Sequence, residues 1–220
     1  MAIINFARDD PRMITANFGL AEFQCPPTCG CNAQLIDDDL IKRLQTIRDK
    51  LGGKIKITSG YRCVKHNKRV GGGKASKHLY GVAADWRMQD RSINPVALGI
   101  VATRYFGAVG IYWYGDSAFV HTDTRKGKGK ATWLCTAKGK YVYTSYRSFI
   151  LPTIKKGCTG DVNKSATLLL QRLLGIPVDG NFGIGTENAL RKAQAAHGLT
   201  VDGVCGPASW KAISGADKYL

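Results

Sequence analysis

Apolar residues in the first 150 positions follow two different periods. Between residues 36 and 51, and again from Pro95 to Tyr105, they recur at helical spacing, which predicts two helices. Asp37 to Asp39 and Gly52-Gly53 suit the start and end of the first helix. Shorter β-branched or alternating segments predict strands at 55–58, 82–87, 108–114, 118–124 and 138–146. This order predicts an α+β fold with helices early and a mostly antiparallel sheet.

The last third of the chain contains an internal repeat. Gln171 and Val178-Asp179-Gly180 recur 23 positions later as Gln194 and Val201-Asp202-Gly203. Each copy predicts a helix, a turn and an Asp-Gly loop, and two copies are needed to bury one apolar face. The repeat aligns Cys205 with Phe182, which predicts a small core position for this cysteine. Residues 151–157 predict a linker, so we expect domains at 1–150 and 157–220.

Charge and hydropathy limit the classes of partner that we expect for the protein. The chain has 220 residues with 44% hydrophobic residues, enough for a packed core, and a net charge of +16. This charge favours polyanions such as nucleic acid, anionic lipid or wall polymers. No apolar stretch is long enough to cross a membrane, so no membrane insertion is expected. The first eight residues lack the layout of a secretory signal, so we expect a cytoplasmic protein or one exported by another route.

Seven cysteines stand at positions 25, 29, 31, 63, 135, 158 and 205. The first three form the segment Cys-Pro-Pro-Thr-Cys-Gly-Cys, and a metal site there would need a fourth ligand, for which Cys63 is the nearest candidate. A tight loop of buried or reduced thiols is the plainer interpretation, and we favour it. The odd number and the large core argue against a disulfide-rich scaffold.

Two histidine segments carry the candidate chemistry. His78 and Asp85 lie seven positions apart with Gly81 between them, and strand alternation places His121 and Asp123 on one face. Two imidazoles and one carboxylate suit zinc with one position open for water, as in catalytic sites. A histidine and an aspartate at this spacing also occur by chance, so spacing alone leaves a purely structural role open.

The combined motifs resemble the zinc D-Ala-D-Ala carboxypeptidase family of peptidoglycan peptidases. The resemblance covers roughly residues 15–125 and rests on Asn17 to Phe23, Ile57 to Arg62, His66-Asn67, Gly71-Gly72, Ser76 to His78, Gly81, Ala84-Asp85 and Phe119 to Asp123. It implies the small α+β fold shared with hedgehog signalling domains. It also implies that His78, Asp85 and His121 bind one zinc ion, which lowers the pKa of bound water and polarises the scissile carbonyl.

The resemblance implies substrate contacts as well. Arg62 matches the family's arginine near the substrate carboxylate or carbonyl, where a planar guanidinium suits bidentate binding. Ser76 is expected to donate a hydrogen bond to the metal loop or the substrate, with a turn-capping hydroxyl as the alternative. Many relatives carry an acid three residues before the last zinc ligand, but this chain has Ala118 there. Asp123 is therefore our first candidate for the general base, or else a residue that orients a ligand, and Asp116 is the second.

Residues 157–214 resemble a three-helix peptidoglycan-binding domain, through Gly160-Asp161-Val162, the two Val-Asp-Gly loops and Gly206 to Trp210. A tethered wall-binding domain raises the local concentration of substrate. We therefore expect a monomeric zinc peptidase that cuts peptidoglycan stems or cross-links. The pairing of such a peptidase with a wall-binding domain, without a visible signal, is common among phage endolysins, which reach the wall through a holin. A non-catalytic zinc-containing wall-binding protein and a nucleic-acid binder are the alternatives.

Overall fold

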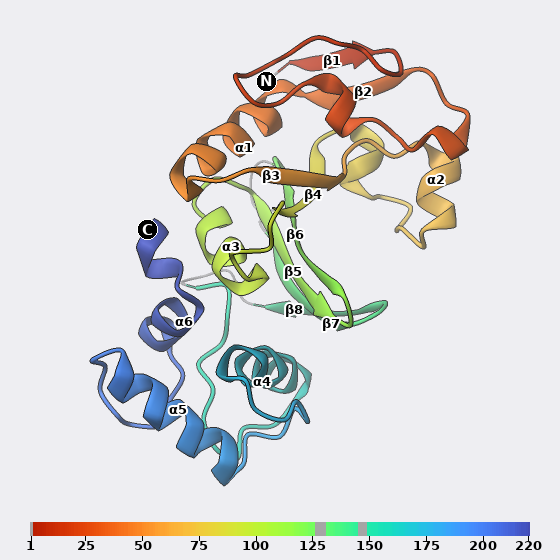
Figure 1. The fold of residues 1–220 in the computed structure, drawn as a ribbon. Coiled ribbons are helices and arrows are strands. Elements are labelled where there is room, and N and C mark those ends of the chain that lie inside the picture. Colours follow the sequence, from red (N-terminus) through yellow and green to blue (C-terminus); the bar gives the residue numbers. More distant parts are fainter. Residues whose placement is uncertain (1, 126–130, 145–148) are drawn as a thin grey trace. The chain divides into compact units, whose positions relative to one another are not determined.

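The computed structural model of the protein describes residues 2–125, 131–144 and 149–220 (Figure 1). It confirms the α+β fold predicted from the sequence. The helices are α1 (Asp38–Leu51), α2 (Val64–Arg69), α3 (Pro95–Ala102), α4 (Asp161–Leu174), α5 (Ile184–Ala196) and α6 (Pro207–Ser214). Short 3₁₀ turns are η1 (Leu20–Phe23), η2 (Pro27–Cys29), η3 (Lys77–Tyr80) and η5 (Ala216–Tyr219). The strands are β1 (Ile3–Phe6), β2 (Gln34–Asp37), β3 (Ile55–Ser59), β4 (Ala83–Met88), β5 (Ala108–Tyr114), β6 (Ser117–Asp123), β7 (Ala131–Ala137) and β8 (Lys140–Thr144).

The strands form two sheets. β1 and β2 pair antiparallel, and the six-stranded sheet has the order β3-β4-β6-β5-β7-β8. Within it, β3–β4 and β7–β8 are antiparallel pairs. The predicted strands 55–58, 82–87, 108–114 and 118–124 correspond to β3, β4, β5 and β6. Because β6 is the direct neighbour of β4, two segments that lie far apart in the sequence supply adjacent backbones for the site.

Two helix boundaries differ from the sequence predictions. The helix predicted from residue 36 begins at Asp38, because Ile36 pairs with Ile4 across the β1–β2 ribbon. Asp37 acts as the helix cap, its carboxylate accepting a hydrogen bond from the backbone N of Asp39 at 3.1 Å. The helix predicted to reach Tyr105 ends at Ala102.

The segment predicted as one strand over 138–146 is the second half of a hairpin. β7, which the sequence analysis missed, precedes β8, and Gly139 turns the chain between them with a φ of 74°. Such a positive φ favours glycine. Residues 145 and 146 of the predicted strand lie outside the described residues.

The chain divides into two compact units. The first consists of Met1–Ser92, Tyr105–Ala108 and His121–Gly129, and the second of Ile93–Arg104, Val109–Val120 and Lys130–Leu220. All three predicted zinc ligands and the first four cysteines belong to the first unit, whereas Asp116 belongs to the second. In the part of the chain that the structure describes, no helix combines the length and the apolarity that a membrane span requires.

The repeat forms two matching loops, each closed by a buried glutamine. In the first copy, Gln171 Nε2 donates to Asp179 Oδ1 at 2.7 Å, and its Oε1 accepts from the N of Gly180 at 2.9 Å. In the second, Gln194 Nε2 donates to Asp202 Oδ1 at 2.8 Å, and its Oε1 accepts from the N of Gly203 at 3.0 Å. The 23-residue repeat is therefore a repeat of hydrogen bonds as well as of sequence.

Residues 151–157, predicted as a linker, instead join the packing of the repeat. Ile154 is buried and forms a β-bridge with Cys205, and the indole of Trp210 donates to the carbonyl of Pro152 at 2.8 Å. The predicted core positions of Cys205 and Phe182 are confirmed, because both side chains are buried. Burial also raises the pKa of the Cys205 thiol, as expected for an unreactive core cysteine.

We expect Gln194→Ala to lower the free energy of unfolding by about 2 kcal/mol. The change leaves the N–H of Gly203 and the carbonyl of Val204 without their side-chain partners, and an unsatisfied buried polar group costs about 1–3 kcal/mol. Urea unfolding followed by circular dichroism measures the effect. Lys192→Ala, on the exposed part of the same helix, is the control and should change stability by less than about 0.5 kcal/mol. Equal midpoints for wild type and Gln194→Ala would show that the glutamine does not hold the loop.

Candidate metal centre

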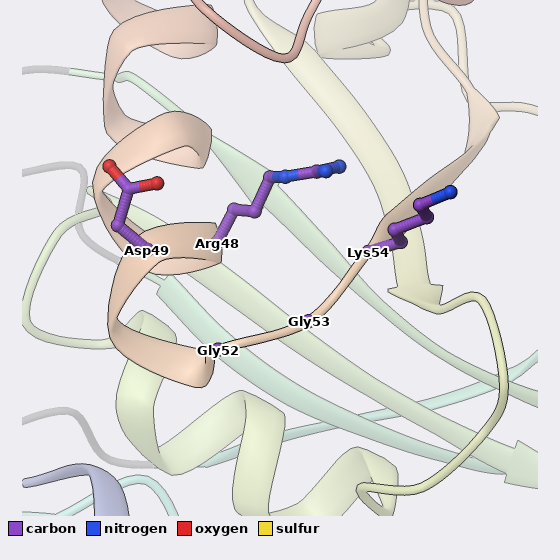
Figure 2. Close-up of a pocket in the computed structure, with 5 residues that line it drawn as sticks. All are labelled: Arg48, Asp49, Gly52, Gly53 and Lys54. Carbon is purple, nitrogen blue, oxygen red and sulfur yellow. The ribbon is translucent and has the colours of Figure 1, made fainter.

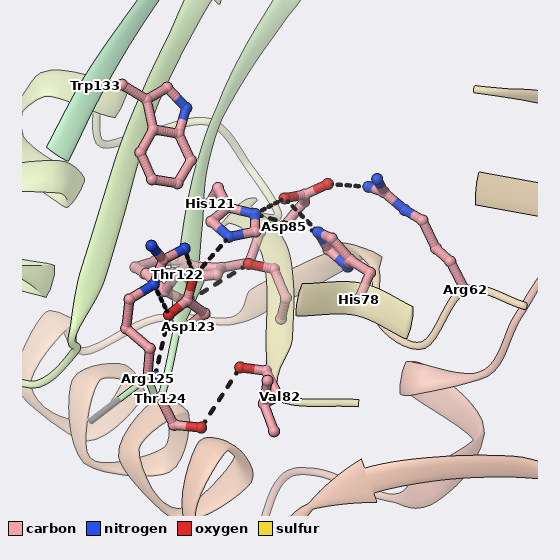
Figure 3. A network of polar contacts seen from close by, with 12 residues as sticks. Arg62, His78, Val82, Asp85, His121, Thr122, Asp123, Thr124, Arg125 and Trp133 are labelled. Carbon is pink, nitrogen blue, oxygen red and sulfur yellow. Dashed lines mark hydrogen bonds and ion pairs between the residues drawn. The ribbon is translucent and has the colours of Figure 1, made fainter. Parts of the chain in front are cut away.

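Three side chains from three separate elements converge in the first unit (Figure 3). His78 lies on η3, Asp85 on β4 and His121 on β6. His78 Nε2 is 3.2 Å from Asp85 Oδ1 and 3.1 Å from His121 Nδ1, and His121 Nδ1 is 2.8 Å from Asp85 Oδ1. All three side chains are buried. The structure thus brings together the three residues that the sequence singled out as ligands.

A glycine between His78 and Asp85 makes this convergence possible. Gly81 ends η3 with a φ of 64°, and a Cβ on it would lie 2.3 Å from the carbonyl oxygen of Leu35. Its own carbonyl accepts a hydrogen bond from the N of Asp37 at 2.9 Å. A side chain here would meet both backbone strain and a steric clash. The chain therefore turns tightly at Gly81 and enters β4 in the direction that places Asp85 beside His78.

The sheet fixes the other two ligands relative to each other. Asp85 is paired with Ser59 across β3–β4, next to a register shift in β3. On the neighbouring residues of β4 and β6, the indole of Trp86 donates to Thr122 Oγ1 at 3.0 Å. Because adjacent side chains in a strand point to opposite faces, this contact lies on the face opposite Asp85 and His121. It locks the register that sets the two ligands side by side.

Each imidazole has one nitrogen held by the protein and one aimed at the centre. His78 Nδ1 donates to the carbonyl oxygen of Gly60 at 2.7 Å, which leaves Nε2 as the acceptor. His121 Nε2 faces Asp123 Oδ2 at 3.4 Å, which leaves Nδ1 toward Asp85. Such outer contacts fix the tautomer and the ring orientation of metal-binding histidines. Both free lone pairs therefore point at the same place.

Asp123 is fully enclosed behind His121. Arg125 holds both of its oxygens, with Nε 2.8 Å from Oδ1 and Nη2 2.6 Å from Oδ2, and the N of Arg125 donates to Oδ1 at 3.1 Å. Burial alone would raise the pKa of Asp123, but His121 and Arg125 lower it well below its usual value. Asp123 therefore stays ionised, and its contact is with the nitrogen of His121 that faces away from the other two ligands.

Arg62 contacts the centre through Asp85. Its Nη2 pairs with Asp85 Oδ2, the oxygen that does not face the imidazoles, and its Nε donates to Ser59 Oγ at 2.7 Å. The backbone N of Arg62 also donates to the carbonyl of His78 at 3.1 Å. The arginine side chain is 15% exposed, so part of its surface faces solvent. It is thus anchored at the rim of the centre.

The two histidines titrate in opposite directions. Burial lowers the pKa of His78 and keeps that ring neutral. Burial also disfavours the charged form of His121. The hydrogen bonds between its ring and the carboxylates of Asp123 and Asp85 outweigh this burial effect and raise the pKa of His121. For Asp85, burial is outweighed by His78 and His121, which hold its pKa well below its usual value. Of the two imidazoles, His121 is therefore the one that binds a proton more readily.

The spacing of the three donor atoms fits one tetrahedral zinc ion. Zinc binds imidazole nitrogen at about 2.0–2.1 Å and carboxylate oxygen at about 2.0–2.2 Å, so two ligands in a tetrahedron lie about 3.3 Å apart. The separations of 2.8–3.2 Å between His78, Asp85 and His121 are close to this value. Two imidazoles and one carboxylate leave a fourth position for water or substrate, as in catalytic zinc sites.

The remaining predicted residues lie at different places. Ser76 precedes η3 as its cap residue, but its side chain makes no capping hydrogen bond, which argues against the capping alternative. Asp116 is exposed in the turn between β5 and β6 of the second unit. The roles of both remain predictions. A pocket of about 290 Å³ at the end of α1, lined by Arg48, Asp49 and Gly52 to Lys54, contains none of the predicted site residues (Figure 2).

Sequence reasoning missed several supporting residues. The carbonyl of Gly60 orients His78, Ser59 anchors Arg62, and Arg125 encloses Asp123. A backbone carbonyl gives no sequence signal, so the role of Gly60 could not be read from its residue type. Strand alternation does place Arg125 on the same face as His121 and Asp123, but its ion pair with Asp123 was not predicted.

An α+β unit that presents two histidines and one aspartate at zinc-binding separations has the ligand set of a zinc site with one open position. Comparison with known families agrees: residues 16–123 match Peptidase M15, and residues 165–213 match a putative peptidoglycan binding domain. The match of the first segment supports a zinc-dependent metallopeptidase of this family, and the match of the second supports a C-terminal peptidoglycan-binding domain. A search of curated proteins finds no match to the chain.

Proposed function

We propose that the protein is a zinc peptidase that cleaves the peptide stems or cross-links of peptidoglycan, as a D-Ala-D-Ala carboxypeptidase or an endopeptidase. The observation that carries the proposal is the buried triangle of His78, Asp85 and His121, in a chain that also contains a peptidoglycan-binding domain. These three residues would hold one zinc ion. Zinc in such a site supplies a water of lowered pKa and polarises the scissile carbonyl.

Asp123 acts in this proposal as a positioning residue. A general base works best with a pKa near the working pH, whereas the pKa of Asp123 lies well below its usual value. Its carboxylate is also fully buried and contacts His121 and Arg125. We therefore assign to it the orientation of His121.

Arg62 and Ser76 are the proposed substrate contacts. Arg62 is fixed at one end by Ser59 and Asp85, so its guanidinium is already ordered before substrate arrives. An ordered, planar cation suits a substrate carboxylate or a carbonyl that gains negative charge. Ser76 lies two residues before His78 and does not use its side chain to cap η3, which suits a hydroxyl that hydrogen-bonds to substrate.

We expect Arg62→Lys to raise KM about tenfold or more. Lysine keeps the charge but loses the fork that joins Ser59, Asp85 and substrate, and a hydrogen bond to a charged group contributes about 1.5–3 kcal/mol. Steady-state kinetics on a defined muropeptide, with zinc content checked for each variant, measures the effect. Lys65→Arg, on α2 close by in the sequence, is the control. A wild-type KM in Arg62→Lys would remove Arg62 from the substrate contacts.

Mass spectrometry of the products decides the proposal and the bond that is cut. The full-length protein, loaded with zinc, is incubated with purified walls and with defined muropeptides. Release of free D-alanine identifies a carboxypeptidase, and new amino termini within stems or bridges identify an endopeptidase. Binding to walls without either product would overturn the proposal.

That last result would support the second candidate, a non-catalytic zinc-containing wall-binding protein. The observation in its favour is Ala118, which stands where related peptidases carry an acid. The enzyme is preferred because the centre retains a full set of three zinc-binding side chains.

The proposal extends to the domain organisation of the protein and to the place where it acts. We propose that residues 1–150 form the peptidase domain and residues 157–220 the wall-binding domain, and that the chain acts at the bacterial cell wall as a monomer. The net charge of +16 suits anionic wall polymers, without any role for nucleic acid. A phage endolysin released through a holin fits these features.

A further inference from the structure

A second cluster of metal-binding side chains lies in the first unit, outside the centre described above. The Sγ atoms of Cys25, Cys29, Cys31 and Cys63 all lie within 4.8 Å of one another, and those of Cys25 and Cys29 are 3.1 Å apart. The first three come from the loop around η2, and the fourth is the residue that caps α2. Cys25 and Cys29 are buried, whereas Cys31 and Cys63 are half-buried.

The size of the cluster suits one tetrahedral ion. Zinc binds thiolate sulfur at about 2.3 Å, so four sulfurs around one ion lie about 3.8 Å apart. The Sγ atoms of Cys25 and Cys29 are 3.1 Å apart and all four sulfurs lie within 4.8 Å of one another, so the cluster has the size of such a site. A disulfide requires about 2.05 Å, and all four cysteines are free thiols. An iron–sulfur cluster places its own iron and sulfide atoms between the cysteines and needs a wider cage.

Three N–H groups of the protein point at sulfurs of the cluster. The backbone N of Cys63 lies 3.5 Å from Cys25 Sγ, and the backbone N of His66 lies 3.4 Å from Cys63 Sγ, both as hydrogen-bond donors. Arg69 Nη2 lies 4.0 Å from Cys29 Sγ. Four thiolates and one divalent ion carry a net charge of −2, which a guanidinium and N–H donors partly offset.

The loop is held in place before any ion binds. Arg8 donates to the carbonyl of Cys25 at 3.0 Å and to the carbonyl of Cys31 at 2.8 Å, so one guanidinium spans the loop. Gln34 accepts a hydrogen bond from the N of Cys25. Gly30, between the second and third cysteines, has a φ of 70°, which turns the chain so that Cys29 and Cys31 face the same point.

We propose that Cys25, Cys29, Cys31 and Cys63 bind a second, structural zinc ion. Four protein ligands close the coordination sphere, as in structural rather than catalytic zinc sites. The sequence analysis favoured reduced thiols without metal for this loop. The structure changes that preference because it brings Cys63, distant in sequence, to within ligand distance of the other three.

This ion would stabilise the segment that positions residues of the peptidase centre. Cys63 directly follows Arg62, and the N of Tyr61 donates to the carbonyl of Phe23 at 2.7 Å, so the loop of the first three cysteines and the Gly60–Arg62 segment are joined at two points. Gly60 orients His78 and Arg62 contacts Asp85. The four-cysteine site therefore fixes the segment that positions one zinc ligand and the substrate arginine.

Metal analysis of the full-length protein, purified with reductant, tests the proposal. We expect two zinc ions per chain in the wild type, one in Cys31→Ser, one in His121→Ala and none in the double variant. Cys158→Ser, a half-buried cysteine of the second unit, is the matched control and should keep two. Cobalt-substituted wild type and His121→Ala should both show a thiolate-to-cobalt charge-transfer band, which Cys31→Ser should lose.

Three results would overturn the proposal. One is a single zinc in the wild type that Cys31→Ser leaves unchanged. The second is iron instead of zinc in the His121→Ala protein. The third is a disulfide among the four cysteines in reductant-purified wild type, detected by peptide mass spectrometry. If Cys31→Ser fails to fold, the cobalt spectrum of His121→Ala decides, since its remaining ion must then show thiolate ligands. These readouts do not depend on activity, so they stand apart from the proposed peptidase function.

Discussion

His121→Ala is expected to lower the rate of peptidoglycan hydrolysis by about a thousandfold or more. The variant loses one of three ligands and with it the zinc, which contributes several kcal/mol of charge stabilisation in the transition state, and each 1.36 kcal/mol corresponds to a factor of ten. Removal of the imidazole also takes away one hydrogen-bond partner of Asp85 and one of Asp123. The rate of release of new amino termini or free D-alanine from purified walls measures the effect.

The comparison needs a folded variant and a matched substitution. Circular dichroism should show retained structure, and wall binding should persist, because the peptidoglycan-binding residues 165–213 are unchanged. His197→Ala, at an exposed position of the repeat, should leave hydrolysis at the wild-type rate. A folded His121→Ala protein that digests walls as fast as the wild type would disprove the zinc mechanism.

Asp123→Asn is expected to weaken zinc binding at this centre by about 10–100-fold at neutral pH. Partners that orient a metal-binding histidine typically contribute this much to metal affinity. The amide removes the negative charge that faces His121 Nε2 and that Arg125 neutralises in part. Competition with a zinc chelator, in wild type and in Asp90→Asn as an exposed control, gives the affinities.

The pH dependence separates positioning from a general loss of stability. The pKa of His121 is raised in part by Asp123, so in the wild type a proton competes with zinc from a comparatively high pH downward. Without the carboxylate the pKa of His121 falls. The pH below which zinc affinity declines should therefore move to a lower value in Asp123→Asn. A weaker affinity with an unchanged pH profile would mean that Asp123 does not act through His121.

The three candidate zinc ligands could be predicted from the sequence, whereas most of the residues that orient them could not. The convergence of His78, Asp85 and His121 could be predicted because these residue types suit zinc and because specific motifs surround them. Periodicity also located β3 to β6, whose alternating side chains give a clear signal. What could not be predicted depends on contacts between distant segments.

Two examples show the physical reason. The β1–β2 ribbon consists of four-residue strands, too short for a periodic pattern, and Ile36 fits a helix and a strand equally well until Ile4 pairs with it. The four-cysteine cluster was undervalued because Cys63 is remote in sequence from Cys31, and contacts between distant segments, such as that of Tyr61 with Phe23, bring the two together. Local propensity carries no information about such pairings.

The glutamine of each repeat has a consequence for which substitutions the two Val-Asp-Gly loops can tolerate. Gln171 and Gln194 each close a loop only eight positions further along the chain, so closure costs little entropy and depends on no other part of the protein. Val178 and Val201 at these loops remain exposed. Substitutions at the exposed loop surface can thus change its side chains while the hydrogen-bonded scaffold stays intact. Because each loop is closed by the glutamine of its own copy, the two copies can vary one at a time.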